Sequence, residues 1–131
     1  MGQIQSILII EDDACIAKLL LAVFADEYHV RIFDSAVDAL AALKQEPADL
    51  VLCDACLPTL NGYSFIQQLR ADPETECIPV VIMSGLDDGF GEDYARDVGA
   101  AAFISKPFTV VEIREVVQAP FGCGRARPPV S

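Results

Sequence analysis

The chain has 131 residues and a formal net charge of −11, with 53% hydrophobic and 22% charged residues. A chain of this length forms one compact domain, and its apolar content is high enough for a core, which argues against disorder. The excess of acidic residues would repel the phosphate backbone of DNA or RNA. The composition therefore predicts one soluble globular domain that does not contact nucleic acid directly.

The sequence also bears on the compartment. No apolar run reaches the roughly 18–20 residues of a membrane span, and residues 1–6 lack the basic and then apolar pattern of a secretory signal. We therefore expect a cytoplasmic protein without membrane association. An odd number of cysteines favours reduced, buried thiols over a disulfide framework. The five cysteines are Cys15, Cys53, Cys56, Cys77 and Cys123.

Short apolar segments alternate with amphipathic segments along the chain. The first apolar segment, Ser6–Ile10, stops abruptly at the acidic residues 11–13, as expected for a strand buried on both faces. The next apolar residues recur at helical spacing and predict a helix over Ala14–Ala25. The same pattern predicts four more strands, at His29–Phe33, Leu50–Cys53, Pro79–Met83 and Ala101–Ser105.

A helix is expected after each of these strands. The second helix follows Ser35, whose hydroxyl can cap it. A loop that includes Gly62 precedes the third helix, which stops near Asp72. Gly99 ends the fourth helix, and the fifth runs from about Thr109 to the proline at position 120.

Five strands that alternate with five helices predict a flavodoxin-like, doubly wound α/β fold in a single domain, with a parallel sheet covered on both faces. The strand order that we expect is 2-1-3-4-5, which the pattern permits without proving. Ligands of such sheets bind beyond the carboxyl ends of the strands, where the strand order reverses. The acids after the first strand and Asp54 after the third strand would meet there.

Three acids in one place require a counter-charge. Two carboxylates about 4 Å apart repel by about 4 kcal/mol at an effective dielectric constant near 20, so Glu11, Asp12 and Asp54 point to a cation or a bound proton. Mg²⁺ prefers such oxygen ligands. Ser84 and Lys106 add a hydroxyl and an ammonium at the same edge, and both suit a phosphoryl oxygen. The alternative is that the acids are solvated charges at strand ends.

Four motifs carry a resemblance to a known family. They are Glu11-Asp12, residues 54–62 (DACLPTLNG), Ser84-Gly85, and Gly99-Ala100 followed by residues 103–108 (FISKPF). In this order and at these spacings they resemble the receiver domain of two-component response regulators. The likeness extends to about Gln118. We therefore expect a receiver domain over residues 1–119 and a flexible tail over residues 120–131.

The resemblance implies a phosphoryl-binding site with Mg²⁺ and no organic cofactor. Asp54 would accept the phosphoryl group from a histidine kinase or a phosphotransfer protein. Asp54, Asp12 and the backbone carbonyl of Cys56 would bind Mg²⁺ directly, with Glu11 acting through water. Lys106 would neutralise phosphoryl charge.

The resemblance also implies a switch. Ser84 would hydrogen-bond a phosphoryl oxygen and, by moving, make room for the ring of Phe103, where many members of the family carry tyrosine. The face built from the fourth helix, the fifth strand and the fifth helix would then bind an effector protein, and a homodimer that forms on phosphorylation stays open. Such a protein is a signalling domain that assists its own phosphotransfer and dephosphorylation, not an enzyme with a separate substrate.

Three other functions match parts of this pattern. A phosphatase with an aspartate nucleophile would also use Asp54, Ser84 and Lys106, but it would need an acid where this chain has Cys56. A flavin site would place the flavin phosphate against the acid cluster, which would repel it. A receiver fold that is never phosphorylated would not need the intact set of Asp12, Asp54, Ser84 and Lys106.

Overall fold

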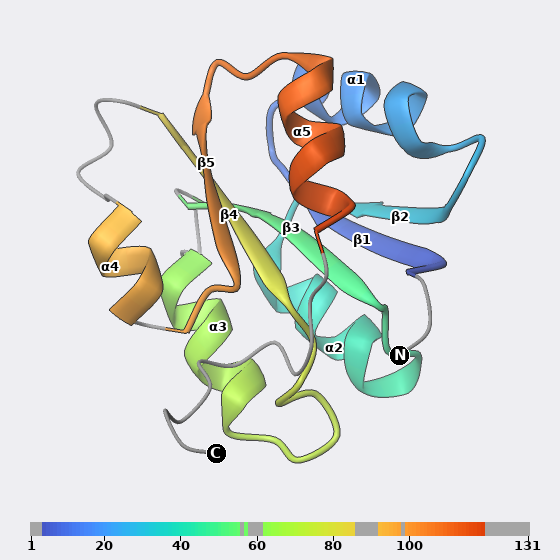
Figure 1. Ribbon diagram of the computed structural model, residues 1–131. Helices are drawn as coiled ribbons and strands as arrows, with labels where there is room; N and C mark the ends of the chain where they lie inside the picture. Colours follow the sequence, from blue (N-terminus) through green and yellow to red (C-terminus); the bar gives the residue numbers. More distant parts are fainter. Residues whose placement is uncertain (1–3, 56, 58–61, 86–91, 98, 120–131) are drawn as a thin grey trace.

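The computed structural model describes residues 4–55, 57, 62–85, 92–97 and 99–119. Strands and helices alternate along the chain (Figure 1). The predicted tail over residues 120–131 lies outside the described residues. The elements are β1 (Ser6–Ile10), α1 (Ala14–Phe24), β2 (His29–Phe33), α2 (Ala36–Gln45), β3 (Leu50–Asp54), α3 (Gly62–Arg70), β4 (Val80–Gly85), α4 (Glu92–Asp97), β5 (Ala102–Lys106) and α5 (Val110–Val117).

The five strands form one sheet in the order β2-β1-β3-β4-β5, and each neighbouring pair is parallel. The predicted fold class and strand order are confirmed. The order reverses between β1 and β3, whose register pairs Ile10 with Cys53. The residues that follow Ile10 therefore lie beside Asp54 at the carboxyl edge of the sheet.

Helices cover both faces of this sheet. α1 and α5 lie on one face, whereas α2, α3 and α4 lie on the other (Figure 1). Because β3 is central and covered on both sides, all five of its residues are buried. This burial explains why residues Leu50–Cys53 are all apolar instead of alternating with polar residues.

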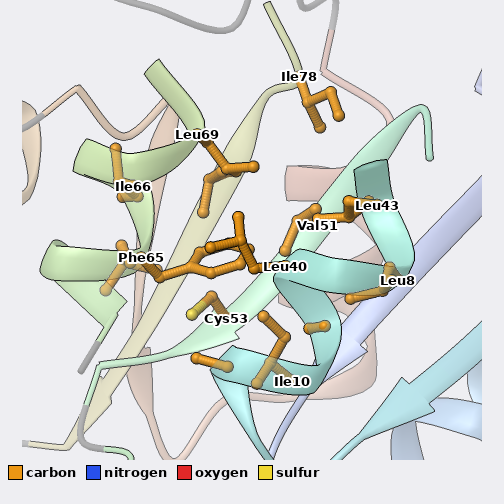
Figure 2. Packing of buried hydrophobic residues seen from close by; sticks show 14 of the residues in the cluster. Leu8, Ile10, Leu40, Leu43, Val51, Cys53, Phe65, Ile66, Leu69 and Ile78 are labelled. Atoms are coloured by element: carbon orange, nitrogen blue, oxygen red, sulfur yellow. The ribbon is translucent and has the colours of Figure 1, made fainter. Parts of the chain in front are cut away.

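The core on the α2 and α3 face takes alternate residues from the strands, because successive side chains of a strand point to opposite faces. Figure 2 shows Leu8, Ile10, Val51 and Cys53 of the strands packed against Leu40, Leu43, Phe65, Ile66 and Leu69 of the helices. Burial of this apolar surface, at roughly 25 cal/mol per Å², stabilises the sheet and fixes the end of β3 in space.

The core on the α1 and α5 face is smaller. α5 contributes Ile113 and Val117, one helical turn apart, and both are buried. On the outer side of the same helix, Arg114 Nη1 lies 3.1 Å from Glu27 Oε1, and Nη2 donates to the carbonyl oxygen of Val23 at 3.0 Å. Arg114 thus links α5 to the end of α1.

Side chains cap three helices at their N-termini. Asp13 accepts hydrogen bonds from two backbone N–H groups of α1, and Ser35 accepts one from α2, as predicted for Ser35. Thr109 and Glu112 form a capping box at α5. Each cap satisfies N–H groups that have no partner within the helix, typically worth about 1 kcal/mol.

Several element boundaries differ from the prediction. β3 extends through Asp54, β4 through Gly85 and β5 through Lys106, because the backbone ladder continues past the last apolar residue. Ser84 is paired with Ser105 in that ladder. Gly62, which we predicted in a loop, is the first residue of α3.

The cysteines follow the prediction only in part. Cys53 is free and buried, and burial, followed by the charges of Asp54 and Glu11, raises the pKa of its thiol. Cys15 is free but exposed. The prediction of reduced thiols is wrong for Cys77, which is disulfide-bonded. Cys56 and Cys123 lie outside the described residues.

The helices are short. The longest helix of the described residues, α1, has 11 residues, whereas a span of the membrane needs about 20. Among the described residues, no helix combines the length and the apolar character required to cross a membrane.

Arg70, the last residue of α3, binds three backbone carbonyl oxygens. Its Nη1 donates to Glu76 at 3.0 Å and to Ile78 at 2.8 Å, and its Nη2 donates to Gly99 at 3.0 Å. Gly99 has φ +100°, a conformation that glycine adopts readily and other residues avoid. Arg70 therefore ties the end of α3 to the start of β4 and to the turn between α4 and β5.

We predict that Arg70→Met lowers the free energy of unfolding by about 2–4 kcal/mol, because three partly buried carbonyls lose a charged donor while the alkyl stem is retained. Urea unfolding followed by circular dichroism measures this. Arg96→Met is the matched control, since within the described part of the chain the Arg96 side chain pairs with the exposed Asp93 alone, and it should cost less than about 1 kcal/mol. Equal losses in the two variants would show that these three bonds do not stabilise the fold.

Candidate functional site

Polar side chains gather at the carboxyl edge of the sheet. Glu11 and Asp12 follow β1, and Asp54 is the last residue of β3. Carboxylate oxygens of these three residues all lie within 4.8 Å of one another. Ser84 and Lys106 lie in the last two residues of β4 and β5. The structure thus brings the three acids together as the strand order required.

The three acids differ in burial. Glu11 is 2% exposed and Asp54 is 6% exposed, whereas Asp12 is exposed. At 4.8 Å two ionised carboxylates repel by about 3–4 kcal/mol at an effective dielectric constant of 20. Two buried acids, Glu11 and Asp54, therefore concentrate negative charge at the edge of the sheet. The exposed Asp12 keeps the cluster open to water and ions.

Lys106 is the counter-charge of the cluster. Its Nζ lies 3.0 Å from Glu11 Oε1 and 3.4 Å from Asp54 Oδ1. Burial by itself lowers the pKa of Lys106, but the hydrogen bond and charge of Glu11, together with Asp54, outweigh it and raise that pKa. Lys106 is therefore an ammonium at neutral pH. From the sequence we expected its partner to be Asp54 or a phosphoryl group, and the contact with Glu11 is new.

The pKa of Glu11 is raised in this cluster. Its burial and then the charge of Asp54 raise the pKa of its carboxyl to about 7, although Lys106 and the N–H of Asp13 act in the opposite direction. The Asp13 N–H lies 3.2 Å from Glu11 Oε2. Without a cation, the cluster therefore retains a proton on Glu11 up to neutral pH.

The donor set fits a hard divalent cation such as Mg²⁺. Asp12 and Asp54 offer carboxylate oxygens, and Glu11, whose pKa is raised by burial and then by the charge of Asp54, lies beside them. The exposure of Asp12 leaves room for the waters that Mg²⁺ retains. Cys56, whose carbonyl we expected as a further ligand, lies outside the described residues.

Ser84 and Phe103 share one face of the sheet. Ile82 and Phe103 are neighbours in the register, and both contact the core of the α2 and α3 face. Ser84 is two residues beyond Ile82, so its side chain points to that same face. Ser84 is 1% exposed, and its Oγ donates to the carbonyl of Gly85 at 3.3 Å. Phe103 is only partly buried.

Gly62 packs against the backbone at the end of β3, a contact that the sequence analysis did not predict. A Cβ at this position would lie 2.9 Å from the carbonyl oxygen of Asp54 and 3.1 Å from the Cα of Ala55. The N–H of Gly62 also donates to the carbonyl of Ala55 at 3.1 Å. The absence of a side chain therefore lets α3 begin directly against the end of β3. The only signal in the sequence was the Asn-Gly pair, which by itself indicates a turn.

Comparison with known proteins finds one family over most of the chain. The family model of the response regulator receiver domain matches residues 7–118. A probable cyclic di-GMP phosphodiesterase from Vibrio cholerae is 32% identical over 80% of this chain and 24% of its own length. The DNA-binding response regulator MtrA from Mycolicibacterium paratuberculosis is 33% identical over 88% of this chain and 50% of its own length. The chain thus spans a quarter to a half of these relatives.

The fold has close counterparts among solved structures. A putative response regulator from Chloroflexus aurantiacus superposes with a TM-score of 0.81 at 28% identity, over 88% of this chain and 95% of that protein. The agreement covers nearly the whole of both chains. The alternation of strands and helices described above is therefore shared with a protein of the same length class.

We predict that Gly62→Ala displaces the end of β3, because the new Cβ would meet backbone atoms that cannot move independently. The free energy of unfolding should fall by about 1–3 kcal/mol, and the amide resonances of Asp54 and Ala55 should shift in ¹H–¹⁵N spectra. Gly99→Ala is the matched control, since its cost arises from the positive φ at a distant turn. If both variants leave the Asp54 resonance in place, Gly62 does not position the site.

The raised pKa of Glu11 makes stability depend on pH. Between its ordinary value of 4.5 and about 7, the unfolded chain loses this proton while the folded chain keeps it, so the free energy of unfolding falls as the pH rises. We expect wild type to lose about 1–3 kcal/mol relative to Glu11→Gln across this interval, in buffers free of divalent cations.

Urea unfolding at several pH values measures this difference. Glu46→Gln removes the same charge at an exposed position and serves as the control. Parallel stability curves for wild type and Glu11→Gln would contradict a proton held on Glu11.

Proposed function

The chain belongs to the response regulator receiver domain family, and from this premise we propose that it accepts a phosphoryl group on Asp54 in a Mg²⁺-dependent reaction. Receiver domains are the signalling modules of two-component systems. The observation that carries the proposal is the cluster of three carboxylates at the switch point of the sheet, two of them buried in contact with one ammonium. The phosphoryl donor is a histidine kinase or a phosphotransfer protein.

Asp54 is the nucleophile of this reaction. One of its carboxylate oxygens forms a bond to phosphorus while the bond between phosphorus and the imidazole nitrogen of the donor breaks. The electron pair of that bond stays on the nitrogen, and the product is an acyl phosphate on Asp54. The protein contributes chiefly position and electrostatic stabilisation, because phosphoryl transfer requires little other covalent chemistry.

Charge balance explains the need for metal. Glu11, Asp12 and Asp54, when ionised, exceed the single charge of Lys106, and a phosphoryl group adds more negative charge. As the family resemblance implies, Asp12 and Asp54 would hold Mg²⁺, Glu11 would act through water, and the backbone carbonyl of Cys56 would be a further protein group. The metal would supply positive charge next to the transferred oxygens. Lys106 exchanges its contact with Asp54 for one with the phosphoryl group.

Ser84 and Phe103 transmit the change. Ser84 donates its hydroxyl to a phosphoryl oxygen, and the ring of Phe103 moves into the space that this shift creates. Phe103 has no hydroxyl, so its two positions differ in packing and not in a hydrogen bond of its own. The balance between two conformations of the face formed by α4, β5 and α5 shifts accordingly. An effector protein binds the conformation that phosphorylation favours.

The remaining assignments complete the proposal. The receiver domain occupies residues 1–119, an assignment supported by the family match over residues 7–118, and the predicted tail lies outside the described residues. The protein acts in the cytoplasm, assists its own dephosphorylation and does not touch nucleic acid or membrane directly. Phosphorylation-dependent pairing of two copies is part of the same proposal.

We expect incubation with acetyl phosphate and Mg²⁺ to add one phosphoryl group, seen by intact mass spectrometry. Asp54→Ala should abolish the adduct, and removal of divalent cations with EDTA should reduce it at least tenfold. Asp34→Ala is the matched control, because Asp34 is an exposed acid that also follows a strand.

The adduct should be released by hydroxylamine, as expected for an acyl phosphate. An adduct that persists in Asp54→Ala would move the phosphoacceptor to another residue. Absence of any adduct in the presence of Mg²⁺, with rapid-quench sampling, would leave a receiver fold that binds partners without this chemistry.

A further inference from the structure

A groove runs between β5 and α5, away from the acidic cluster. It is open to solvent and has a volume of about 500 Å³. The strand side is formed by residues 103–105, and the helix side includes Glu112, Glu115 and Val116. Three consecutive strand residues line it, whereas one face of a strand would present only alternate residues. The groove therefore lies along the edge of the sheet.

The edge of β5 has backbone groups directed into this groove. β5 is the last strand in the sheet order and, within the described part of the chain, pairs only with β4. The carbonyls of Pro79 and Met83 accept from the β3 side, whereas the carbonyl of Val80 accepts from Ala101, so Ile82 and Ser84 direct their backbone groups toward β5. Their register partners are Phe103 and Ser105, and a parallel ladder bonds to the residues on either side of such partners, so the N–H and C=O of Phe103 and Ser105 point away from β4. A further strand added here would find donors and acceptors in register.

The helix side of the groove is acidic. Glu112 and Glu115 are three residues apart and lie on neighbouring turns of α5. Glu112 Oε1 accepts from the N–H of Thr109 at 2.8 Å, so the capping box fixes the orientation of this carboxylate. Neither glutamate takes part in the ion pairs found among the described residues. Val116 and the partly buried Phe103 add apolar surface between strand and helix.

We infer that this groove binds an extended segment of a partner protein, which adds as a strand beside β5 and places basic side chains against Glu112 and Glu115. Main-chain hydrogen bonds to Phe103 and Ser105 would supply affinity, and alternate side chains would supply specificity. Apolar residues between the basic ones would contact Phe103 and Val116. A second copy of the chain is disfavoured as the occupant, because it would bring another net charge of −11.

This inference rests on the proposed function for its setting, since β5 and α5 belong to the proposed effector face. The binding itself needs no phosphoryl group. It predicts a partner with a short basic and apolar segment in extended form, in contrast to a helix laid across the helices of this face.

The test uses a fluorescent octapeptide in which valine alternates with arginine, titrated with the full chain at low salt. We expect Glu112→Gln with Glu115→Gln to weaken binding about three- to tenfold, since two exposed ion pairs are lost. Glutamine at position 112 can keep the capping box, so the helix start is retained. Glu46→Gln with Glu74→Gln removes two exposed charges elsewhere and should leave affinity within twofold.

Two further probes test strand addition. The same peptide with alternate N-methylated amides should bind at least tenfold more weakly, and ¹H–¹⁵N spectra should show the largest shifts at residues 103–105. Equal loss in both double variants or indifference to N-methylation would each overturn the inference. Because the acetyl phosphate reaction is measured on the same sample, failure of peptide binding is distinguishable from failure of the phosphoacceptor.

Discussion

A single ammonium group makes this site physically tenable. Lys106 Nζ contacts Glu11 and Asp54, two carboxylates that are almost fully buried beside each other. Burial and then the charge of Asp54 raise the pKa of Glu11 to about 7, and Lys106 acts in the opposite direction. Among the described residues, three carboxylates gather around this one ammonium. The site is thus left one positive partner short, which is the electrostatic condition for binding a cation.

The sheet holds the carboxylates and the ammonium of Lys106 at fixed spacing. Residues on β1, β3 and β5 come from three distant parts of the chain, and only the strand order brings their carboxyl ends together. Apolar packing on two faces sets that order, so the chemistry at the edge depends on hydrophobic burial below it. Gly62 adds a local constraint, because α3 must begin almost in contact with the backbone of Asp54.

Much of this could be predicted from the sequence. Strands that are short, largely apolar runs can be delimited from sequence, so the mostly buried Ser6–Ile10 and the partly buried His29–Phe33 have the predicted limits. Asp54 was placed just beyond a strand, although it is the last residue within it, because a side-chain pattern cannot show where backbone pairing stops. The acids could be assigned to one edge, since strand ends define it. The contact of Lys106 with Glu11 depends on side-chain reach in three dimensions and has no sequence signature.

The hydrogen bonds of Arg70 fix the amino edge of the sheet. They join the end of α3, the start of β4 and the turn before β5, all at the amino edge of the sheet. These bonds hold the amino edge in one arrangement, so the switch proposed at the carboxyl edge would leave the surface around Arg70 unchanged. A protein that docks there would bind the phosphorylated and the unphosphorylated domain with equal affinity.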